Sequence, residues 1–131
     1  MLWSKIYIDR SDSIHKHCQI INNYEIKKFL KSKGFKIFKL SNFPFKKQIS
    51  IFYNAKLIVG PHGAGFSNLV FCRKNTKVIE IKPKNHPNKV YETISKINKL
   101  NYNLIKLRHI KNNNKGDIFL RKEILDKFLK L

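Results

Sequence analysis

The chain has 131 residues, of which 42% are hydrophobic. This length suits one compact domain with its own core and is short for two, so we expect a single domain over residues 1–131. The longest apolar runs break after a few residues, which predicts no transmembrane segment, and the N-terminus lacks the apolar centre of a signal peptide. These features argue against an integral membrane protein or an exported one, and favour a cytoplasmic location, at the membrane surface or away from it.

The chain is strongly basic, with 28 Lys and Arg against 8 Asp and Glu, for a formal charge of +20. Clustered basic residues would suit a nucleic acid, because they release counterions from its backbone. Here, however, lysines lie along every segment, together with many Asn and Ile residues, as expected from a coding sequence rich in A and T. The distribution argues against nucleic-acid binding as the main function, while the charge still favours an anionic ligand such as a nucleotide.

Two cysteines, Cys18 and Cys72, are too few for a disulfide framework or a zinc site. We interpret both as free thiols in a reducing compartment. His15 and His17 lie beside an aspartate, but no third ligand follows at a suitable spacing. We therefore expect no metal and no cofactor.

The first part of the chain predicts two strands and two helices. A short apolar strand surrounds Ile6 and Ile8, and Asn22 and Asn23 are good caps for a helix that Gly34 ends. The apolar face of this helix is Ile26, Phe29 and Leu30. Segment 35–40 is apolar on both faces, as a strand covered by helices should be. A second helix follows, with Ser41 and Asn42 as caps, Pro44 in its first turn, and Phe45, Ile49 and Phe52 at helical spacing.

The remainder continues the alternation. A third strand at 56–59 enters a glycine-rich turn, a short helix follows at 66–71, and 77–81 is a fourth strand. After the loop 82–87 come a helix marked by Val90, Ile94, Ile97 and Leu100 and a fifth strand at 102–107. A polar turn at 111–116 precedes a closing helix with the apolar face Phe119, Ile124, Leu125 and Phe128. Strands that alternate with helices imply an α/β fold, a parallel sheet of five strands with helices on both faces.

The loop Gly60-Pro61-His62-Gly63-Ala64-Gly65 joins a strand to a helix, where open α/β sheets bind ligands. Its glycines let the backbone approach phosphate oxygens, and His62 can donate a hydrogen bond to a phosphate or stabilise charge on a leaving diphosphate. The loop has neither the Walker pattern nor the dinucleotide fingerprint. A tight turn with a structural histidine explains the same residues.

A second cluster, Asp9-Arg10-Ser11-Asp12-Ser13, follows the first strand at the same carboxyl edge. Arg10 suits a forked contact with phosphate, and pairing of Arg10 with Asp9 or Asp12 is the structural alternative. The nearby Lys16 and the two histidines are further basic groups.

Glu80, inside an apolar strand, either reaches a ribose or sugar hydroxyl or pairs with Lys56, Lys77 or Lys82. Asn68 and Ser67 follow the glycine loop directly and suit either a helix cap or a ligand contact. We interpret the remaining lysines as a solvated face.

An ordered series of segments carries a family resemblance: Ile8-Asp-Arg-Ser-Asp-Ser13, Ile20-Ile-Asn-Asn-Tyr-Glu25, Gly34-Phe35, Gln48, Ala55, Gly60-Pro-His-Gly-Ala-Gly-Phe-Ser-Asn-Leu-Val-Phe71 and Val78-Ile-Glu-Ile81. In this order, over residues 6–107, the series resembles the C-terminal region of glycosyltransferase family 61. The resemblance implies the Rossmann-like, donor-binding half of a two-domain GT-B enzyme. Such an enzyme transfers a sugar from a nucleotide sugar to a glycan or polysaccharide acceptor, with inversion and without a metal.

The resemblance points to Arg10 and the loop at 62–65, and we predict that Arg10, Lys16 and the loop residues Gly60, Gly63, Ala64 and Gly65 bind the diphosphate, with His62 stabilising the leaving group. It also assigns substrate contacts to Asn68 and Glu80. Two departures from the family pattern stand out. The basic residues after Ser13 have an altered spacing, which leaves Lys16, His15 and His17 as candidates for the second phosphate contact, and Asn23 replaces a glutamate.

The family also has a preceding acceptor domain that these residues do not provide, so we expect the acceptor half and the general base on a separate chain or domain. The alternative function is a non-catalytic basic binding module, either a stranded fragment or a nucleic-acid binder.

Overall fold

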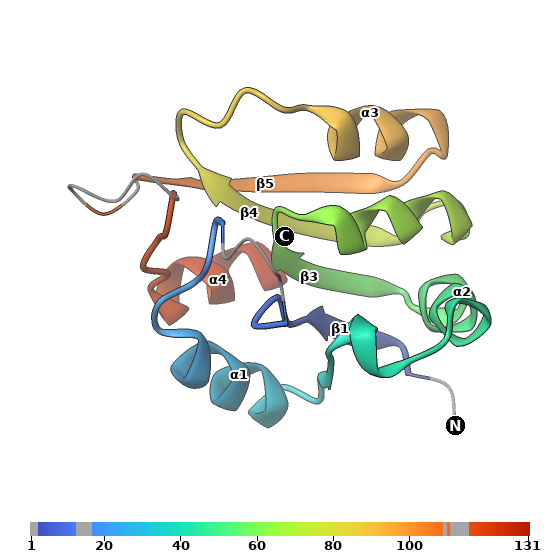
Figure 1. Ribbon diagram of the computed structural model, residues 1–131, viewed down its shortest axis with the longest axis horizontal. Coiled ribbons are helices and arrows are strands. Elements are labelled where there is room, and N and C mark those ends of the chain that lie inside the picture. Colours follow the sequence, from blue (N-terminus) through green and yellow to red (C-terminus); the bar gives the residue numbers. More distant parts are fainter. Residues whose placement is uncertain (1–2, 13–16, 109, 111–115) are drawn as a thin grey trace.

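The computed structural model of the protein describes residues 3–12, 17–108, 110 and 116–131. Its centre is a five-stranded sheet in the order β2-β1-β3-β4-β5, with every neighbouring pair parallel (Figure 1). The strands are β1 (Lys5–Ile8), β2 (Lys36–Phe38), β3 (Leu57–Pro61), β4 (Lys77–Pro83) and β5 (Asn101–Leu107). The predicted α/β, Rossmann-like parallel sheet is therefore confirmed.

Helices cover both faces of this sheet. One face carries α1 (Asn23–Ser32) and α4 (Lys122–Leu129), whereas the other carries α2 (Phe45–Asn54), the 3₁₀ helix η2 (Ala64–Phe71) and α3 (Val90–Ile97) (Figure 1). The strands supply both cores by simple alternation. Ile6 and Ile8 of β1 pack on the η2 side, and Tyr7 between them packs on the α1 side. Continuous apolar runs are what a parallel sheet buried on both faces requires.

The edge strand β2 is shorter than predicted but has the predicted two apolar faces. Phe35 and Ile37 belong to the α1 side, and Phe38 and Leu40 belong to the α2 side. Leu40 starts a 3₁₀ turn, η1 (Leu40–Asn42), and Pro44 is the residue immediately before α2. The prediction that Ser41 and Asn42 cap α2 and that Pro44 lies in its first turn was therefore wrong.

The expected caps of α1 have other partners. Asn22 precedes the helix as predicted, but its side chain makes no capping hydrogen bond. It pairs instead with the backbone of Leu120, donating to the carbonyl at 2.6 Å and accepting from the amide at 3.0 Å. Asn23 accepts from the Tyr7 hydroxyl at 2.8 Å. Both amides satisfy polar groups in the tertiary structure, which local sequence rules do not consider.

Several residues expected on apolar helix faces are exposed. Helix α4 begins only at Lys122, so Phe119 lies in an extended segment between the buried residues Ile118 and Leu120 and is 49% exposed. Alternation along that segment turns the Phe119 ring outwards. Ile97, the last residue of α3, is 73% exposed, and Val90 and Phe45, the first residues of their helices, are also exposed. The predicted helix at 66–71 is part of the 3₁₀ helix η2.

Among the described helices, none combines the length and the apolar character needed to cross a membrane.

Candidate functional site at the crevice between β1 and β3

The order of the strands defines a topological switch point between β1 and β3 at the carboxyl edge of the sheet, and this place is called the crevice below. From β1 the chain moves outwards to β2, and β3 then lies on the other side of β1. The segment after β1 leads to α1 on one face, and the loop after β3 leads to η2 on the opposite face. Open α/β sheets bind ligands at the point where two neighbouring strands lead to opposite faces in this way. Arg10 and the glycine loop lie on its two sides.

Arg10 and Gly63 contact each other across this crevice. The Arg10 guanidinium donates from Nη1 to the His62 carbonyl, and also to the His17 carbonyl at 3.0 Å. Its side chain passes so close to Gly63 that a Cβ there would overlap the Nε, Cζ and Cδ atoms of Arg10. The φ angle of Gly63 is 168°, an extended value open to any residue, so space rather than backbone conformation requires the glycine. The structure therefore brings together Arg10 and the loop, as predicted.

The glycine loop presents backbone amides at the start of η2. The His62 amide donates to the Ile81 carbonyl at 2.8 Å, and the Phe66 amide donates to the Gly63 carbonyl at 2.9 Å. For the amides of Ala64 and Gly65, no protein acceptor is found within the described part of the chain. Ala64 is exposed and Gly65 is partly exposed. Amides in this position at a helix start can bind an anion.

A buried network fixes the orientation of His62. Its Nδ1 lies 2.5 Å from Oε2 of Glu80, and the Tyr102 hydroxyl donates to Oε1 of the same carboxylate. Because an ionised carboxylate only accepts, Nδ1 of His62 carries the hydrogen in this pair. Burial raises the pKa of Tyr102, and the hydrogen bond and charge of Glu80 raise it further, so the phenol stays protonated. Glu80 is thus engaged with His62 and Tyr102, and the described residues place no lysine within 4.0 Å of it.

Two further rings cover His62. The centroid of the His86 ring lies 4.2 Å from that of His62, and the Tyr91 ring lies 4.9 Å from it. His62 is 7% exposed and Tyr91 is 6% exposed, whereas His86 is only partly buried. Burial lowers the pKa of His86, and the charges of His62 and Lys82 lower it further. His86 is therefore the ring of this group that solvent reaches, in its neutral form near pH 7.

Lys82 is a buried lysine that the sequence indicated only as one of three possible partners for Glu80. It is 3% exposed, near the end of β4, and its ammonium donates to the Asn88 carbonyl at 2.7 Å. Glu80 and Lys82 are two residues apart on one strand and so share a face. This spacing was the signal that could have placed Lys82 beside the Glu80 network.

Asp9 stabilises the turn that holds Arg10. Its carboxylate is 2% exposed and accepts from the Ser11 amide at 2.9 Å, the Asn23 side chain at 3.0 Å and the Lys27 ammonium at 3.2 Å. Burial alone would raise the pKa of Asp9, but these hydrogen bonds and the Lys27 charge outweigh it and lower the pKa. The ion pair of Asp9 is with Lys27, so the alternative in which Asp9 pairs with Arg10 does not hold.

Other predicted site residues lie elsewhere or outside the described residues. Asn68 is 8% exposed and donates to Gln48 Oε1 at 2.9 Å, in the contact between η2 and α2. Gly60 is in β3, and a Cβ there would lie 3.1 Å from that of Ile8, so it serves close strand packing. Lys16, like His15, falls outside the described residues. Within the described ranges no group of three metal-ligating side chains occurs.

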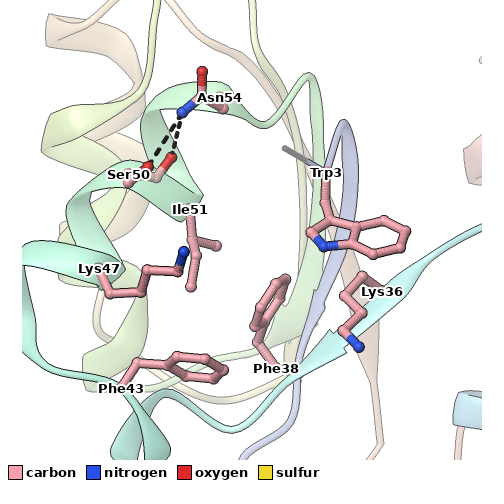
Figure 2. Close-up of a pocket in the computed structure, with 8 residues that line it drawn as sticks. All are labelled: Trp3, Lys36, Phe38, Phe43, Lys47, Ser50, Ile51 and Asn54. Carbon is pink, nitrogen blue, oxygen red and sulfur yellow. Dashed lines mark hydrogen bonds between the residues drawn. The ribbon is translucent and has the colours of Figure 1, made fainter. Parts of the chain in front are cut away.

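A hollow of about 290 Å³ lies apart from these residues, between α2 and the outer edge of the sheet at β2. Figure 2 shows its lining: Trp3, Lys36, Phe38, Phe43, Lys47, Ser50, Ile51 and Asn54. None of the residues predicted to bind a ligand is among them. The crevice, not the hollow, is therefore the candidate site.

Comparison with known families identifies the family of the chain. The family model for glycosyltransferase 61 matches residues 4–79, more than half of the chain. The chain belongs to glycosyltransferase family 61 and is thereby placed among the glycosyltransferases. No curated protein gives a significant match. The matched segment includes Arg10 and the whole glycine loop, and it ends one residue before Glu80.

Proposed function

We propose that this chain is the donor-binding part of an inverting glycosyltransferase and that the β1–β3 crevice binds the diphosphate of a nucleotide sugar. Arg10 and the amides of Ala64 and Gly65 hold the phosphates, and His62 stabilises the leaving nucleoside diphosphate. The acceptor is a glycan or polysaccharide. Family membership supports the reaction class, and the crevice supports the choice of site.

One observation carries the proposal: Arg10 spans the crevice and lies directly against the glycine loop, at the switch point of the sheet. A forked cation and uncommitted backbone amides thus meet at one place. Guanidinium groups and helix-start amides are both strong phosphate partners. Their juxtaposition suits two adjacent phosphates better than it suits an extended polyanion, which would need a broad basic surface.

The proposed chemistry needs positive charge where negative charge develops. As the bond between the sugar and the diphosphate breaks, the leaving phosphate oxygen gains charge, and groups already oriented towards it lower the barrier. Glu80 holds the Nδ1 side of the His62 ring, which leaves Nε2 as the nitrogen for the phosphate. The general base that deprotonates the acceptor belongs, in this proposal, to an acceptor-binding half on another domain or chain.

Calorimetric titration with UDP, UMP and uridine tests the proposal. We expect UDP to bind clearly more tightly than UMP, and Arg10→Ala and His62→Ala to weaken UDP binding by about tenfold or more each. Lys74→Ala is the matched control, because Lys74 is an exposed cation in the turn before β4, at the opposite edge of the sheet. Its affinity for UDP should equal that of the wild type.

Two results would overturn the proposal. One is an affinity for UDP no higher than that for UMP. The other is that heparin and UDP bind alike, that the affinity for both falls steeply with salt, and that Lys74→Ala weakens binding as much as Arg10→Ala does. This is the behaviour of a general basic binding module.

A further inference from the structure

Lys82 occupies an unusual position for a lysine. The pairing of β3 with β4 ends at Pro61 and Ile81, so Lys82 lies one residue beyond it, at the carboxyl edge. Its side chain emerges on the same face as Glu80, which contacts His62. Only 3% of the residue is exposed. The ammonium is therefore held inside the protein, beside the site and not on a solvated surface.

The charge of Lys82 has no anionic partner among the described residues. Its hydrogen bond is to a neutral acceptor, the Asn88 carbonyl, and no carboxylate lies within 4.0 Å of it in the described parts of the chain. The nearest acidic residue along the strand, Glu80, is already engaged by His62 and Tyr102. A buried ammonium with a single neutral partner is costly, and a bound anion would offset that cost.

The charges of Lys82 and Arg10 both influence the Cys18 thiol. The Cys18 thiol is buried, which raises its pKa, and the charges of both Arg10 and Lys82 act in the opposite direction. His86, in the loop after β4, is influenced by Lys82 as well. The contacts agree: Arg10 donates to the His62 carbonyl, and Lys82 shares a face of β4 with Glu80, which holds the His62 ring, so both cations lie around His62.

We propose that Lys82 binds the second phosphate of the ligand, so that Arg10 and Lys82 together select a nucleoside diphosphate over a monophosphate. This inference rests on the proposed function and assigns the second phosphate contact to a residue of β4. The Lys82 ammonium keeps its bond to Asn88 and adds a phosphate oxygen as a further acceptor, because an ammonium has three N–H groups.

The test compares UDP and UMP affinities in the wild type and in Lys82→Met, which keeps the length of the side chain and removes its charge. We expect Lys82→Met to weaken UDP binding by about tenfold to a hundredfold and to change UMP binding by less than about threefold. Lys77→Met is the matched control. Lys77 is also in β4 and donates to the main-chain oxygens of Phe128 and Leu131, but at the amino end of the strand.

The outcomes separate the two proposals. If wild-type protein fails to prefer UDP over UMP, the proposed function fails and this inference fails with it. If the wild type prefers UDP and Lys82→Met keeps the same preference, the inference alone is refuted. A purely structural role, through the Asn88 loop, would weaken UDP and UMP binding alike.

If Lys82→Met does not fold, the NMR signal of the Lys82 Cε atom in the wild type provides a second test of the phosphate contact. It should shift on addition of UDP and not on addition of UMP, and an unchanged signal at saturating UDP would refute the assignment.

Discussion

Substitution of Gly63 by alanine should displace Arg10. Since the φ angle of Gly63 is accessible to any residue, the backbone would tolerate alanine, and the conflict is between the new methyl group and the Arg10 side chain. Relief requires the guanidinium to move, because the opposing atoms at Gly63 belong to a backbone packed at the end of β3. Arg10 would then lose its hydrogen bonds to the carbonyls of His62 and His17.

The expected cost follows from these two bonds. A hydrogen bond from a charged donor contributes about 1.5–3 kcal/mol when well shielded, and the partial exposure of Arg10 reduces that figure. We expect Gly63→Ala to lower the free energy of unfolding by about 1–3 kcal/mol in total. UDP affinity should fall to about that of Arg10→Ala, because both variants remove the guanidinium from the loop.

A double-mutant cycle measured by urea unfolding checks the cause. In an Arg10→Ala background the methyl group at position 63 meets no guanidinium, so Gly63→Ala should then cost less than about 0.5 kcal/mol. Gly34→Ala is the control for a glycine without crowding. Gly34 has a φ of +88°, and a methyl group added there would have no neighbouring atom within 4 Å. Gly34→Ala should therefore cost about 1 kcal/mol of backbone strain, and Arg10→Ala should not change that cost. Equal costs of Gly63→Ala in both backgrounds would refute the reasoning.

Three further predictions concern stability and reactivity. Because the folded pKa of Asp9 is lowered, its carboxylate stabilises the protein above the unfolded pKa of about 3.9 and loses this effect as the pH falls through the folded pKa. The stability gap between wild type and Asp9→Asn in urea unfolding should thus be largest near neutral pH and close in acid, and a constant gap would contradict this. Burial raises the pKa of Cys72 to about 12, so in a Cys18→Ser variant we expect disulfide-exchange reagents at pH 8 to label Cys72 only as fast as the protein opens. Labelling at the rate of a free thiol would count against the buried position. Leu120 is fully buried and Phe119 is half exposed, so thermal unfolding should show a loss of about 2–4 kcal/mol for Leu120→Ala and less than about 1 kcal/mol for Phe119→Ala. A larger loss for Phe119→Ala than for Leu120→Ala would mean that the register of segment 118–120 is wrong.

The order of the elements and the main parts of the crevice could be predicted from the sequence. The alternation of strands with helices depends on local hydrophobic periodicity, and the positions of Arg10 and the glycine loop follow from the rule that parallel strands end at a common edge. Both signals are encoded over a few neighbouring residues. The apolar pattern of segment 35–40 likewise indicated its two buried faces correctly.

Side-chain partners depended on the tertiary structure and could not be predicted in the same way. Asn22 looks like a helix cap locally, yet its partner is the backbone of Leu120. Lys82 looks like one more surface lysine in a very basic chain, yet the loop around Asn88 covers it. The position of Glu80 in the sequence indicated only that a buried carboxylate needs hydrogen-bond partners. Its partners are His62, in the loop after β3, and Tyr102, in β5, so they are set by the packing of segments that are distant in the sequence.

The pairing of Asn22 with Leu120 has a consequence for how the chain folds. These residues are separated by 98 positions, and beside them Ile20 forms a parallel bridge with Ile118. The side of the sheet covered by α1 is completed by Ile118, Leu120 and Leu125. During synthesis, the α1 side would therefore stay open until the residues of α4 have left the ribosome, and closing so long a loop is slow. Protein cut back to the family-matched residues 4–79 would lack this closure, so it should be recovered as an aggregating chain and not as a smaller folded domain.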